Sequence, residues 1–250
     1  MADEFSGKTA LVTGASRGIG AATAVALARR GCKRVVVHYN SYREGAERTA
    51  QEVCAAGAAC DLIHANLATL AGIESFVKEL PETDILINNA GALVKRARLL
   101  EFTSELFDEV MNLNVKSAWM ITQAVVPAMI RRGGGCIVNL SSIAARNGGG
   151  PGAAVYAAAK AAVMTFTKGL AKELAPQGIR VNAVSPGTVD NYFHEQFSTR
   201  QMLDSVVAAT PAGRLATNED IADVIVFLCS DAARYVHGQT IEVNGGILAP

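Results

Sequence analysis

The sequence has no surplus of charge, because 23 Lys and Arg residues balance 23 Asp and Glu residues. Without such a surplus the protein has no strong positive electrostatic field that would attract nucleic acid or an anionic membrane surface. It also lacks Cys-x-x-Cys spacing, and its five scattered cysteines are typical of reduced thiols and argue against zinc. The four histidines form no ligand-spaced group. We therefore expect a small-molecule partner and no metal, nucleic acid or membrane.

Long apolar runs are missing as well. No stretch approaches about eighteen uninterrupted apolar residues. The N-terminus, Met-Ala-Asp-Glu-Phe-Ser, has no basic segment followed by an apolar run, so a cytoplasmic protein is expected. Half of the 250 residues are hydrophobic, which suffices for one sizeable core, and we expect a single domain over residues 1–250.

What the sequence does contain is an alternation of short β-branched runs with longer helical patterns. The strands are apolar on both faces, which is typical of a parallel sheet covered by helices on each side. The predicted fold class is therefore α/β, a single-domain Rossmann-type doubly wound sheet of about seven strands. The pattern predicts helices over 18–30 and 43–56 and between the later strands, and strands near residues 9–13, 34–39, 61–65, 85–88, 136–140, 180–184 and 240–243.

Two segments interrupt this alternation, the Gly-rich loop 147–152 and the stretch 187–214, and both follow strand ends. In open α/β sheets, ligands bind outside the carboxyl ends of strands, so we expect both segments to contact substrate. The part 190–203 supplies enough apolar area for a lid that excludes water, although packing of an amphipathic helix explains the same residues. Its large apolar and aromatic residues are Tyr192, Phe193, His194, Phe197 and Met202.

A glycine-rich turn, Thr-Gly-Ala-Ser-Arg-Gly-Ile-Gly at residues 13–20, lies between the first predicted strand and the first helix. Glycine permits a tight turn there, and the backbone N–H groups of a helix N-terminus bind phosphate. The turn lacks the Gly-Lys-Ser/Thr ending of an ATP-binding loop. It therefore indicates a dinucleotide rather than ATP, the alternative being a turn needed only for strand–helix packing.

Tyr156 and Lys160 are four residues apart in a predicted helix, which places the phenol and the ammonium on one face. A cation about 4 Å away at an effective dielectric of about 20 is worth about 4 kcal/mol, or about 3 pKa units. We therefore expect Lys160 to lower the pKa of Tyr156 into a range useful for proton transfer. By itself, the spacing also fits two unrelated residues on a partly exposed helix.

Six motifs together make the chain resemble the short-chain dehydrogenase/reductase family over nearly its whole length. The resemblance implies an enzyme that transfers hydride between a nicotinamide cofactor and a carbon bearing oxygen. The motifs are the turn 13–20, Asn88-Asn89-Ala90-Gly91, Asn114, Ser142, Tyr156-x-x-x-Lys160 and Pro186-Gly187.

This resemblance assigns a role to each catalytic residue. Tyr156 would exchange a proton with the substrate oxygen, Lys160 would lower its pKa and bind the nicotinamide ribose, and Ser142 would donate to the same oxygen. Asn114 would hold a water that connects Lys160 to solvent. A strand-end role for Ser142 and a backbone hydrogen bond for Asn114 are the alternatives, and Ser141 is a less favoured substitute for Ser142.

The resemblance also implies the cofactor contacts. The second strand ends without a carboxylate, and Arg17 and Arg43 could both reach a 2′-phosphate, which favours NADP(H) over NAD(H). Both arginines fit ordinary solvated surface charges as well. Asn66 stands where relatives often have aspartate, and its amide can make a similar hydrogen bond to adenine. The full set of expected contacts is Gly14, Ser16, Arg17, Gly18, Ile19, Gly20, Tyr39, Asn40, Ser41, Asn66, Leu67, Asn89, Ala90, Gly91, Tyr156, Lys160, Pro186, Gly187 and Val189.

Within this family the chain looks like 3-oxoacyl-acyl-carrier-protein reductases. We expect an NADP(H)-dependent reduction of a carbonyl, 3-oxoacyl or another small ketone, to a secondary alcohol. An NAD-dependent sugar or polyol dehydrogenase and a non-catalytic dinucleotide-binding regulator are the alternatives. Arg131 and Arg132 could attract an acidic carrier or serve the C-terminal end of a helix, whereas Gln177 stands where such reductases can carry arginine.

The family resemblance further implies a homotetramer. Helices around residues 104–132 and 152–174 would pack across one interface, and the segment 238–250 would lie at another. The helix with Tyr156 is rich in alanine, which allows close approach of helices and also favours helix formation.

Overall fold

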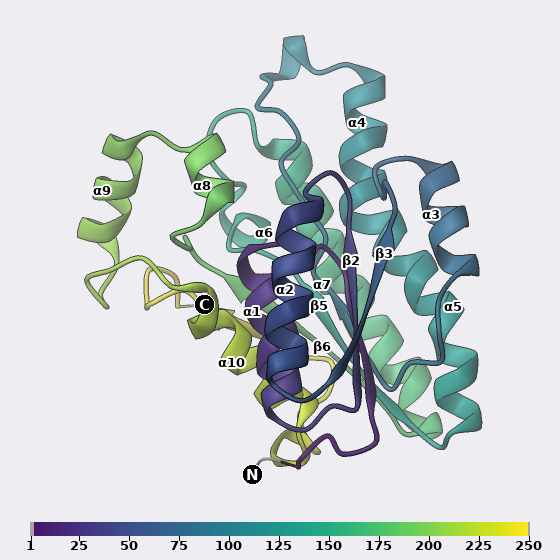
Figure 1. Cartoon of the computed structure of the whole chain (residues 1–250). Coiled ribbons are helices and arrows are strands. Elements are labelled where there is room, and N and C mark those ends of the chain that lie inside the picture. The colour runs from purple at the N-terminus through teal and green to yellow at the C-terminus, as the bar shows by residue number, and fades with distance from the viewer. Residues whose placement is uncertain (1–2, 250) are drawn as a thin grey trace.

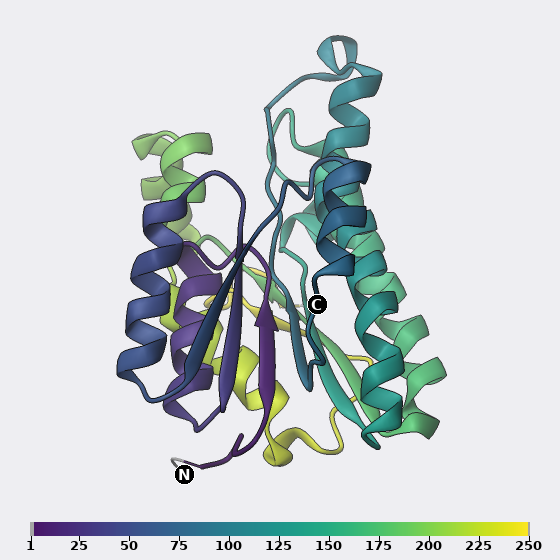
Figure 2. The same ribbon diagram turned by 45° about the vertical axis from the view of Figure 1, so that its right-hand side comes forward.

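The computed structural model describes residues 3–249 and shows one parallel sheet with helices on both faces (Figure 1, Figure 2). The strand order is β3-β2-β1-β4-β5-β6-β7. The chain winds outward from β1 to β3 and then returns to the other side of β1, which confirms the predicted doubly wound fold class. The strands are β1 (Thr9–Val12), β2 (Arg34–Tyr39), β3 (Ala59–His64), β4 (Ile85–Asn88), β5 (Gly135–Leu140), β6 (Ile179–Pro186) and β7 (Thr240–Val243).

Six longer helices cover the sheet, three on each face (Figure 2). One face carries α1 (Gly18–Arg29), α2 (Arg43–Ala55) and α10 (Asn218–Cys229), and the other carries α3 (Leu70–Lys78), α5 (Ser117–Arg131) and α7 (Ala154–Leu174). The shorter segments are α4 (Ser104–Met111), α6 (Ala144–Asn147), α8 (Tyr192–Phe197), α9 (Arg200–Ala209) and the turns η1 (Leu99–Glu101), η2 (Asn112–Lys116), η3 (Ala175–Gln177) and η4 (Asp231–Ala233). Threonine hydroxyls accept a backbone N–H at the starts of α3, α4, α9 and α10, at Thr69, Thr103, Thr199 and Thr217.

Strand β1 shows why the central strands are apolar on both faces. Ala10 and Val12 point into the core under α1 and α10, whereas Leu11 between them points into the core under α3 and α5. All three side chains are fully buried. The expectation is wrong for β3, which is an edge strand with mostly exposed side chains, and its Asp61 forms a 3.3 Å surface ion pair with Arg34.

Two strands are longer than their sequence pattern indicated. The prediction near residues 61–65 corresponds to β3, which begins at Ala59 because Ala59 and Cys60 already pair with β2. The prediction near 180–184 corresponds to β6, which continues through Ser185 and Pro186 because both pair with β7. Backbone pairing to a neighbouring strand, rather than β-branched composition, sets these ends.

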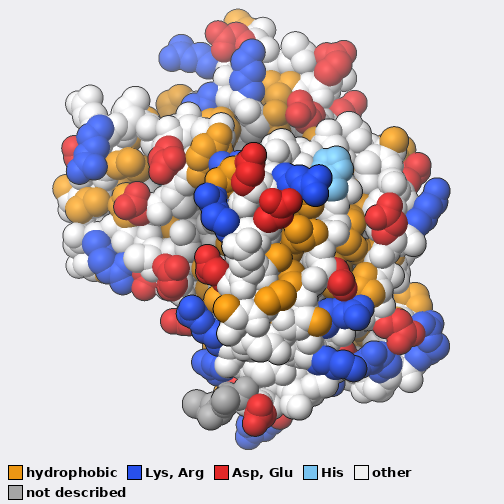
Figure 3. Space-filling view, viewed as in Figure 1, with side chains coloured by type: hydrophobic (Ala, Val, Ile, Leu, Met, Phe, Trp, Pro, Cys, Tyr) orange, Lys and Arg blue, Asp and Glu red, His pale blue; other side chains and the backbone are white. Residues whose placement is uncertain are grey.

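The surface matches the balanced composition. Acidic and basic side chains are interspersed over the face that Figure 3 draws. Within residues 3–249, no helix is both long and apolar enough to cross a membrane. The described residues contain no group of three or more His, Cys, Asp or Glu placed to hold a metal ion. The five cysteines are free thiols, of which Cys32, Cys136 and Cys229 are buried.

Candidate active site

The predicted site residues gather at the carboxyl edge of the sheet. The glycine turn follows β1, Asn89 follows β4, Ser142 follows β5, and Pro186 ends β6. Helix α7 adds Tyr156 and Lys160 from its first two turns. Because the carboxyl ends of parallel strands meet at one edge, segments far apart in the sequence share one site.

Side chains of Thr13 and Asn89 fasten the glycine turn to the loop after β4. Asn89 Nδ2 donates to the carbonyl oxygens of Thr13 and Gly14 at 2.8 and 3.0 Å. The Thr13 hydroxyl oxygen accepts the backbone N–H groups of Asn89 and Ala90 at 3.0 and 2.9 Å. Gly14 has φ +65°, and a Cβ there would lie 2.9 Å from Ala90 Cα, so glycine alone fits. The Asn89 amide nitrogen and backbone N–H thus serve the turn, which leaves its side-chain oxygen and backbone carbonyl oxygen for a cofactor.

The Arg17 guanidinium lies between two tyrosine rings. Its Cζ is 4.3 Å from the ring centre of Tyr42 and 3.8 Å from that of Tyr192. Within the part of the chain that the structure describes, this side chain donates no hydrogen bond and forms no ion pair. At Gly18, the first residue of α1, an added Cβ would meet no atom nearer than 3.6 Å, so space flanks this helix N-terminus. Available donors beside open space fit a dinucleotide phosphate.

The other turn residues are packed more closely. Ser16 and Ile19 are half-buried, and Gly20 is buried where a Cβ would lie 2.5 Å from the Gly14 carbonyl oxygen. Gly20 therefore serves the contact between α1 and the turn. Glycine has this packing role in addition to any contact with a cofactor.

Lys160 is buried, and its Nζ donates a hydrogen bond of 2.8 Å to the carbonyl oxygen of Leu140. Nζ lies 5.7 Å from the ring centre of Tyr156. Tyr156 is half-buried, but desolvation of its hydroxyl raises its pKa to about 12, against a smaller lowering by the hydrogen bond with Ser142. Burial lowers the pKa of Lys160 to about 8. The expectation that Lys160 lowers the pKa of Tyr156 is therefore wrong here, because desolvation of the phenol is the largest effect and raises its pKa.

The structure separates the two serines that follow β5. Ser141 is buried, and its hydroxyl donates to the backbone oxygen of Lys160 at 2.9 Å. Ser142 is half-buried, accepts the Ala144 backbone N–H at 3.2 Å, and lies close enough to the Tyr156 hydroxyl to lower its pKa. Ser142, rather than Ser141, is thus brought to the phenol.

Asn114 lies in the π-helical turn η2 and is buried. Its Nδ2 donates to the carbonyl oxygens of Val110 and Ala92, both at 2.9 Å. Its Oδ1 has no hydrogen-bond partner among residues 3–249. A Cβ on Gly91 would lie 2.7 Å from this oxygen and 2.8 Å from Lys160 Nζ, so both atoms border one space. An orphan acceptor of this kind calls for a water or a ligand hydroxyl as its partner.

Helix α8 extends over Tyr156. The Phe193 ring centre is 5.9 Å from that of Tyr156 and 5.1 Å from that of Phe197. No residue of α8 or α9 is buried, and Figure 1 shows both helices standing beside the sheet. The aromatic residues of this segment therefore cover the site instead of filling either core.

Comparison with known proteins decides the family. The family model described as enoyl-(acyl carrier protein) reductase matches residues 14–248. The 3-oxoacyl-(acyl-carrier-protein) reductase FabG of Staphylococcus aureus is 39% identical over 244 residues, which cover 96% of this chain and 98% of that protein. The chain belongs to the short-chain dehydrogenase/reductase family.

Solved structures of family members agree with this assignment. A putative NAD(P)-dependent gluconate 5-dehydrogenase from Beutenbergia cavernae, with NADP bound at low occupancy, is 37% identical, with a TM-score of 0.91 over 100% of both chains. A blue fluorescent protein from a metagenomic library, in complex with NADPH, is 34% identical with a TM-score of 0.90, over 98% of this chain and 100% of that one. The short-chain dehydrogenase/reductase described here is an NAD(P)-dependent oxidoreductase.

The residues around the end of β2 show which of the two predicted arginines, Arg17 or Arg43, is available to bind a phosphate. Tyr39 is buried, whereas Asn40 and Ser41 are exposed beyond the strand. Arg43 is already engaged, because its Nε lies 2.8 Å from Oε1 of Glu47 in an exposed pair. Arg17 is therefore the better placed of the two predicted arginines.

Some predicted contacts can be made only through the backbone. The side chains of Leu67 and Val189 are 1% and 3% exposed and pack in the two cores. Asn66 is exposed, and its Oδ1 accepts the Ala68 backbone N–H at 3.0 Å, which leaves Nδ2 for adenine. Gly187 donates its backbone N–H to the Val243 carbonyl oxygen at 2.9 Å. Spacing along the sequence identifies such positions but not which of their atoms are available.

His38 is a supporting residue that the sequence analysis missed. Its Nδ1 accepts the Gly14 backbone N–H at 3.0 Å, and its Nε2 lies 3.1 Å from the Ala65 carbonyl oxygen. These partners select the neutral tautomer with the proton on Nε2. Burial, the largest effect, lowers the pKa of His38 to about 4. The one signal in the sequence was a histidine within an otherwise apolar strand.

Arg96 was also missed, and it joins three segments around the site. Its Nε donates to the Phe197 carbonyl oxygen in α8 at 3.0 Å, and its Nη1 donates to the Pro151 carbonyl oxygen in the Gly-rich loop at 2.9 Å. The predicted substrate loops are thus tied to one another through a residue of the β4–α4 connection. Val94, two residues before Arg96, has φ +65°, a strained value for a β-branched residue.

Arg131 and Arg132 do not lie at the mouth of the site. They end α5 just before β5 begins, at the edge of the sheet opposite Tyr156. Arg131 pairs with Glu82 at 3.1 Å, and Arg132 pairs with Asp84 at 2.8 Å. Their acidic partners account for both side chains, so attraction of an acidic carrier to the active site by this pair is not supported.

Four buried polar side chains connect the sheet to two helices behind the site. Asn88 Nδ2 donates to Asn139 Oδ1 at 2.8 Å and to the Thr122 hydroxyl at 3.1 Å. Asn139 Nδ2 in turn donates to the Thr167 hydroxyl at 2.9 Å. This amide ladder, Thr122-Asn88-Asn139-Thr167, joins α5, β4, β5 and α7. Buried hydrogen bonds of this kind fix a unique arrangement of the elements that they join.

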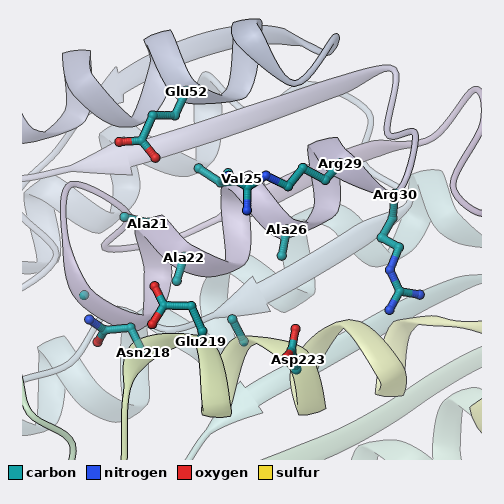
Figure 4. A pocket seen from close by; sticks show the side chains of 12 residues that line it. Ala21, Ala22, Val25, Ala26, Arg29, Arg30, Glu52, Asn218, Glu219 and Asp223 are labelled. Carbon is teal, nitrogen blue, oxygen red and sulfur yellow. The ribbon is translucent and has the colours of Figure 1, made fainter. Parts of the chain in front are cut away.

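A separate cavity of about 420 Å³ lies along the outer side of α1, between α2 and α10 (Figure 4). Glu52 and Arg29 reach toward it, as do Glu219 and Asp223 from α10. Tyr156 does not line this cavity. Gly18 and Asn218 do line it, so the cavity borders the predicted cofactor turn at the start of α1 but lies away from the proton donor.

Proposed function

We propose that this protein uses NADPH to reduce the carbonyl group of a 3-oxoacyl substrate or another small ketone to a secondary alcohol. The placement of Ser142 and Lys160 around Tyr156, under the aromatic cover of α8, carries the proposal. A substrate oxygen at this point would meet two hydroxyl donors as charge develops on it. The name of the Staphylococcus aureus relative supports a 3-oxoacyl substrate.

The protonation states are compatible with reduction of a carbonyl. NADPH, when bound, supplies the hydride. A phenol whose pKa is about 12 is protonated at neutral pH, so Tyr156 is in the form that donates a proton to the carbonyl oxygen. Lys160, with a pKa of about 8, is mostly an ammonium at neutral pH and would bind the ribose hydroxyls. The space between Lys160 and Asn114 would hold the water that returns a proton.

Arg17 supports NADP(H) as the preferred cofactor. Its available guanidinium stands at the N-terminus of α1, and the exposed end of β2 offers Asn40 and Ser41 where a carboxylate would repel a 2′-phosphate. The NADP and NADPH bound by the two solved relatives agree with this preference.

The test is NADPH oxidation by the wild-type protein with acetoacetyl-CoA, a small diketone and a keto sugar acid, beside a Tyr156→Phe variant. We expect turnover with at least the thioester or the diketone, and none in Tyr156→Phe, whose NADPH affinity by direct titration is unchanged because only the proton donor is lost. Near-normal turnover in Tyr156→Phe would overturn the assigned role. NADPH binding without turnover on any carbonyl would favour a dinucleotide-binding regulator, and turnover of the sugar acid with NADH alone would favour a sugar dehydrogenase.

We also infer a homotetramer, with α4, α5 and α7 at one interface. Phe107 and Trp119 are 47% and 46% exposed, and the Trp119 ring centre lies 6.1 Å from that of Phe166 on α7. A large apolar surface on helices predicted to pack across an interface supports this assembly. In the other predicted interface, Pro250 lies outside the described residues. Light scattering would give a mass of about four times 26.1 kDa. A cytoplasmic location stays a prediction from the sequence.

A further inference from the structure

One guanidinium joins three segments that lie far apart in the sequence. Arg17 belongs to the glycine turn, Tyr42 precedes α2, and Tyr192 is the first residue of α8. The Arg17 Cζ stands 3.8 Å from the Tyr192 ring centre and 4.3 Å from the Tyr42 ring centre, close enough for cation–π contact with both. The cofactor turn and the aromatic cover of the substrate site are therefore in direct contact through this arginine.

Stacking leaves the hydrogen-bonding capacity of Arg17 intact. A cation–π contact uses the charge of the guanidinium and none of its N–H donors, so these donors stay available to a phosphate. A side chain held in this way loses less rotational freedom when it binds an anion, because its orientation is already fixed. The Tyr192 hydroxyl is not part of the contact with Arg17. It accepts a hydrogen bond of 2.8 Å from Gln196 Nε2 on the same helix.

We propose that Tyr192 is a positioning residue for cofactor choice, which holds Arg17 in the orientation that binds a 2′-phosphate. The position of α8 against the rest of the protein is thereby coupled to binding of that phosphate. The proposal rests on the NADP(H) preference inferred above. Phe193 connects this contact to the active site, because its ring centre lies 5.9 Å from that of Tyr156. A single short helix thus contacts the cofactor-selecting arginine with one residue and the proton donor with the next.

Linkage gives this contact a kinetic consequence. If the seating of α8 strengthens binding of the 2′-phosphate, binding of the 2′-phosphate strengthens the seating of α8 by the same factor. The side chain of Asn191 anchors the start of the helix, because its Nδ2 donates to Asn218 Oδ1 at 3.1 Å. We therefore expect the KM for the carbonyl substrate to be lower with saturating NADPH than with saturating NADH, in addition to the tighter binding of NADPH itself.

The test compares binding of 2′,5′-ADP and 5′-ADP by calorimetry, since neither probe contains the nicotinamide or needs turnover. Tyr192→Ala is expected to weaken 2′,5′-ADP about three- to fivefold, the range of a cation–π contact, and to leave 5′-ADP unchanged. Tyr192→Phe keeps the ring and is expected to bind both probes as the wild type does. Tyr235→Ala, at a fully exposed tyrosine, is a matched control without effect.

A double-mutant cycle with Arg17→Ala shows whether Tyr192 acts through the arginine. Arg17→Ala is expected to weaken 2′,5′-ADP more than 5′-ADP, and adding Tyr192→Ala to it is expected to cause no further loss. Equal weakening of both probes by Tyr192→Ala, or an undiminished effect in the Arg17→Ala background, would overturn the role of Tyr192 alone. Equal affinity of the wild-type protein for the two probes would overturn the NADP(H) preference itself.

A second readout follows the substrate side in the intact enzyme. The ratio of the carbonyl KM with NADH to that with NADPH is expected to fall toward one in Tyr192→Ala and to stay at the wild-type value in Tyr192→Phe. A ratio unchanged by Tyr192→Ala would contradict the link between the 2′-phosphate and α8, because a merely structural loss would raise both KM values together.

Discussion

The ammonium of Lys160 donates a hydrogen bond of 2.8 Å to the backbone carbonyl oxygen of Leu140, the last residue of β5. This bond fixes the lysine to the sheet. The phenol keeps its proton because desolvation dominates. Lys160 is therefore an anchored cation beside Tyr156, and the proposed proton donor carries its proton at neutral pH.

We expect Ser142→Ala to lower kcat by about 100-fold or more while NADPH affinity stays unchanged. The variant removes one of the two hydroxyls placed to stabilise charge on the substrate oxygen, and loss of one such donor costs roughly 3 kcal/mol of barrier. Single-turnover kinetics with saturating NADPH measures the effect on the chemical step.

Ser141→Ala is the matched control for this prediction. The Ser141 hydroxyl donates to the Lys160 backbone oxygen, so its loss is expected to reduce the free energy of unfolding by about 1–3 kcal/mol. Its effect on kcat is expected to be much smaller than that of Ser142→Ala. If Ser141→Ala lowered kcat as strongly and Ser142→Ala did not, the assignment of the two serines would be reversed.

Arg96→Met is expected to raise the KM for the carbonyl substrate about tenfold with little change in NADPH affinity. The variant keeps the apolar length of the side chain but removes the charged donors to the Phe197 and Pro151 carbonyl oxygens, and such a bond is worth about 1.5–3 kcal/mol. Steady-state kinetics at saturating NADPH gives the split between KM and kcat. Lys95→Met, at the exposed neighbouring residue, is the control, and an equal rise in KM there would show that charge rather than loop positioning matters.

His38 is expected to make the protein less stable below neutral pH. The unfolded chain binds a proton at this histidine near pH 6.5, whereas the folded protein binds it only near pH 4. Between these values the unfolded state carries more protons, so the free energy of unfolding falls as the pH falls, by about 2 kcal/mol from pH 7 to pH 5. Urea unfolding at the two pH values measures this loss.

His38→Asn keeps an acceptor for the Gly14 N–H and is expected to show a correspondingly smaller difference between pH 7 and pH 5. His194, whose pKa is also lowered to about 4, mainly by burial, contributes in the same direction, so His194→Asn is measured in parallel. An unaltered pH dependence in His38→Asn would exclude His38 as a source of the instability.

The sequence was informative where chemistry depends on local spacing and uninformative where it depends on contacts between loops. Short β-branched runs that are apolar on both faces predicted β1 and β2, and the spacing of Tyr156 and Lys160 predicted that both lie on one face of a helix, which is α7. Arg96 could not be found in this way, because its partners Pro151 and Phe197 lie 55 and 101 positions away, and loop backbone geometry alone brings them together. The pKa of Tyr156 was mispredicted for a related reason, since desolvation depends on everything that packs around the hydroxyl.

The amide ladder from Thr122 to Thr167 has a consequence for how such a protein diversifies. It locks α7, which carries Tyr156, to the middle of the sheet, whereas α8 and α9 bury no residue, and α8 contacts the rest of the chain through Arg17, Arg96 and Asn191. Substitutions in these two helices that keep Phe193 against Tyr156 can reshape the substrate cover while the amide ladder holds α7 in place. New substrates can therefore be acquired in one part of the chain while the hydride-transfer chemistry is inherited unchanged in another.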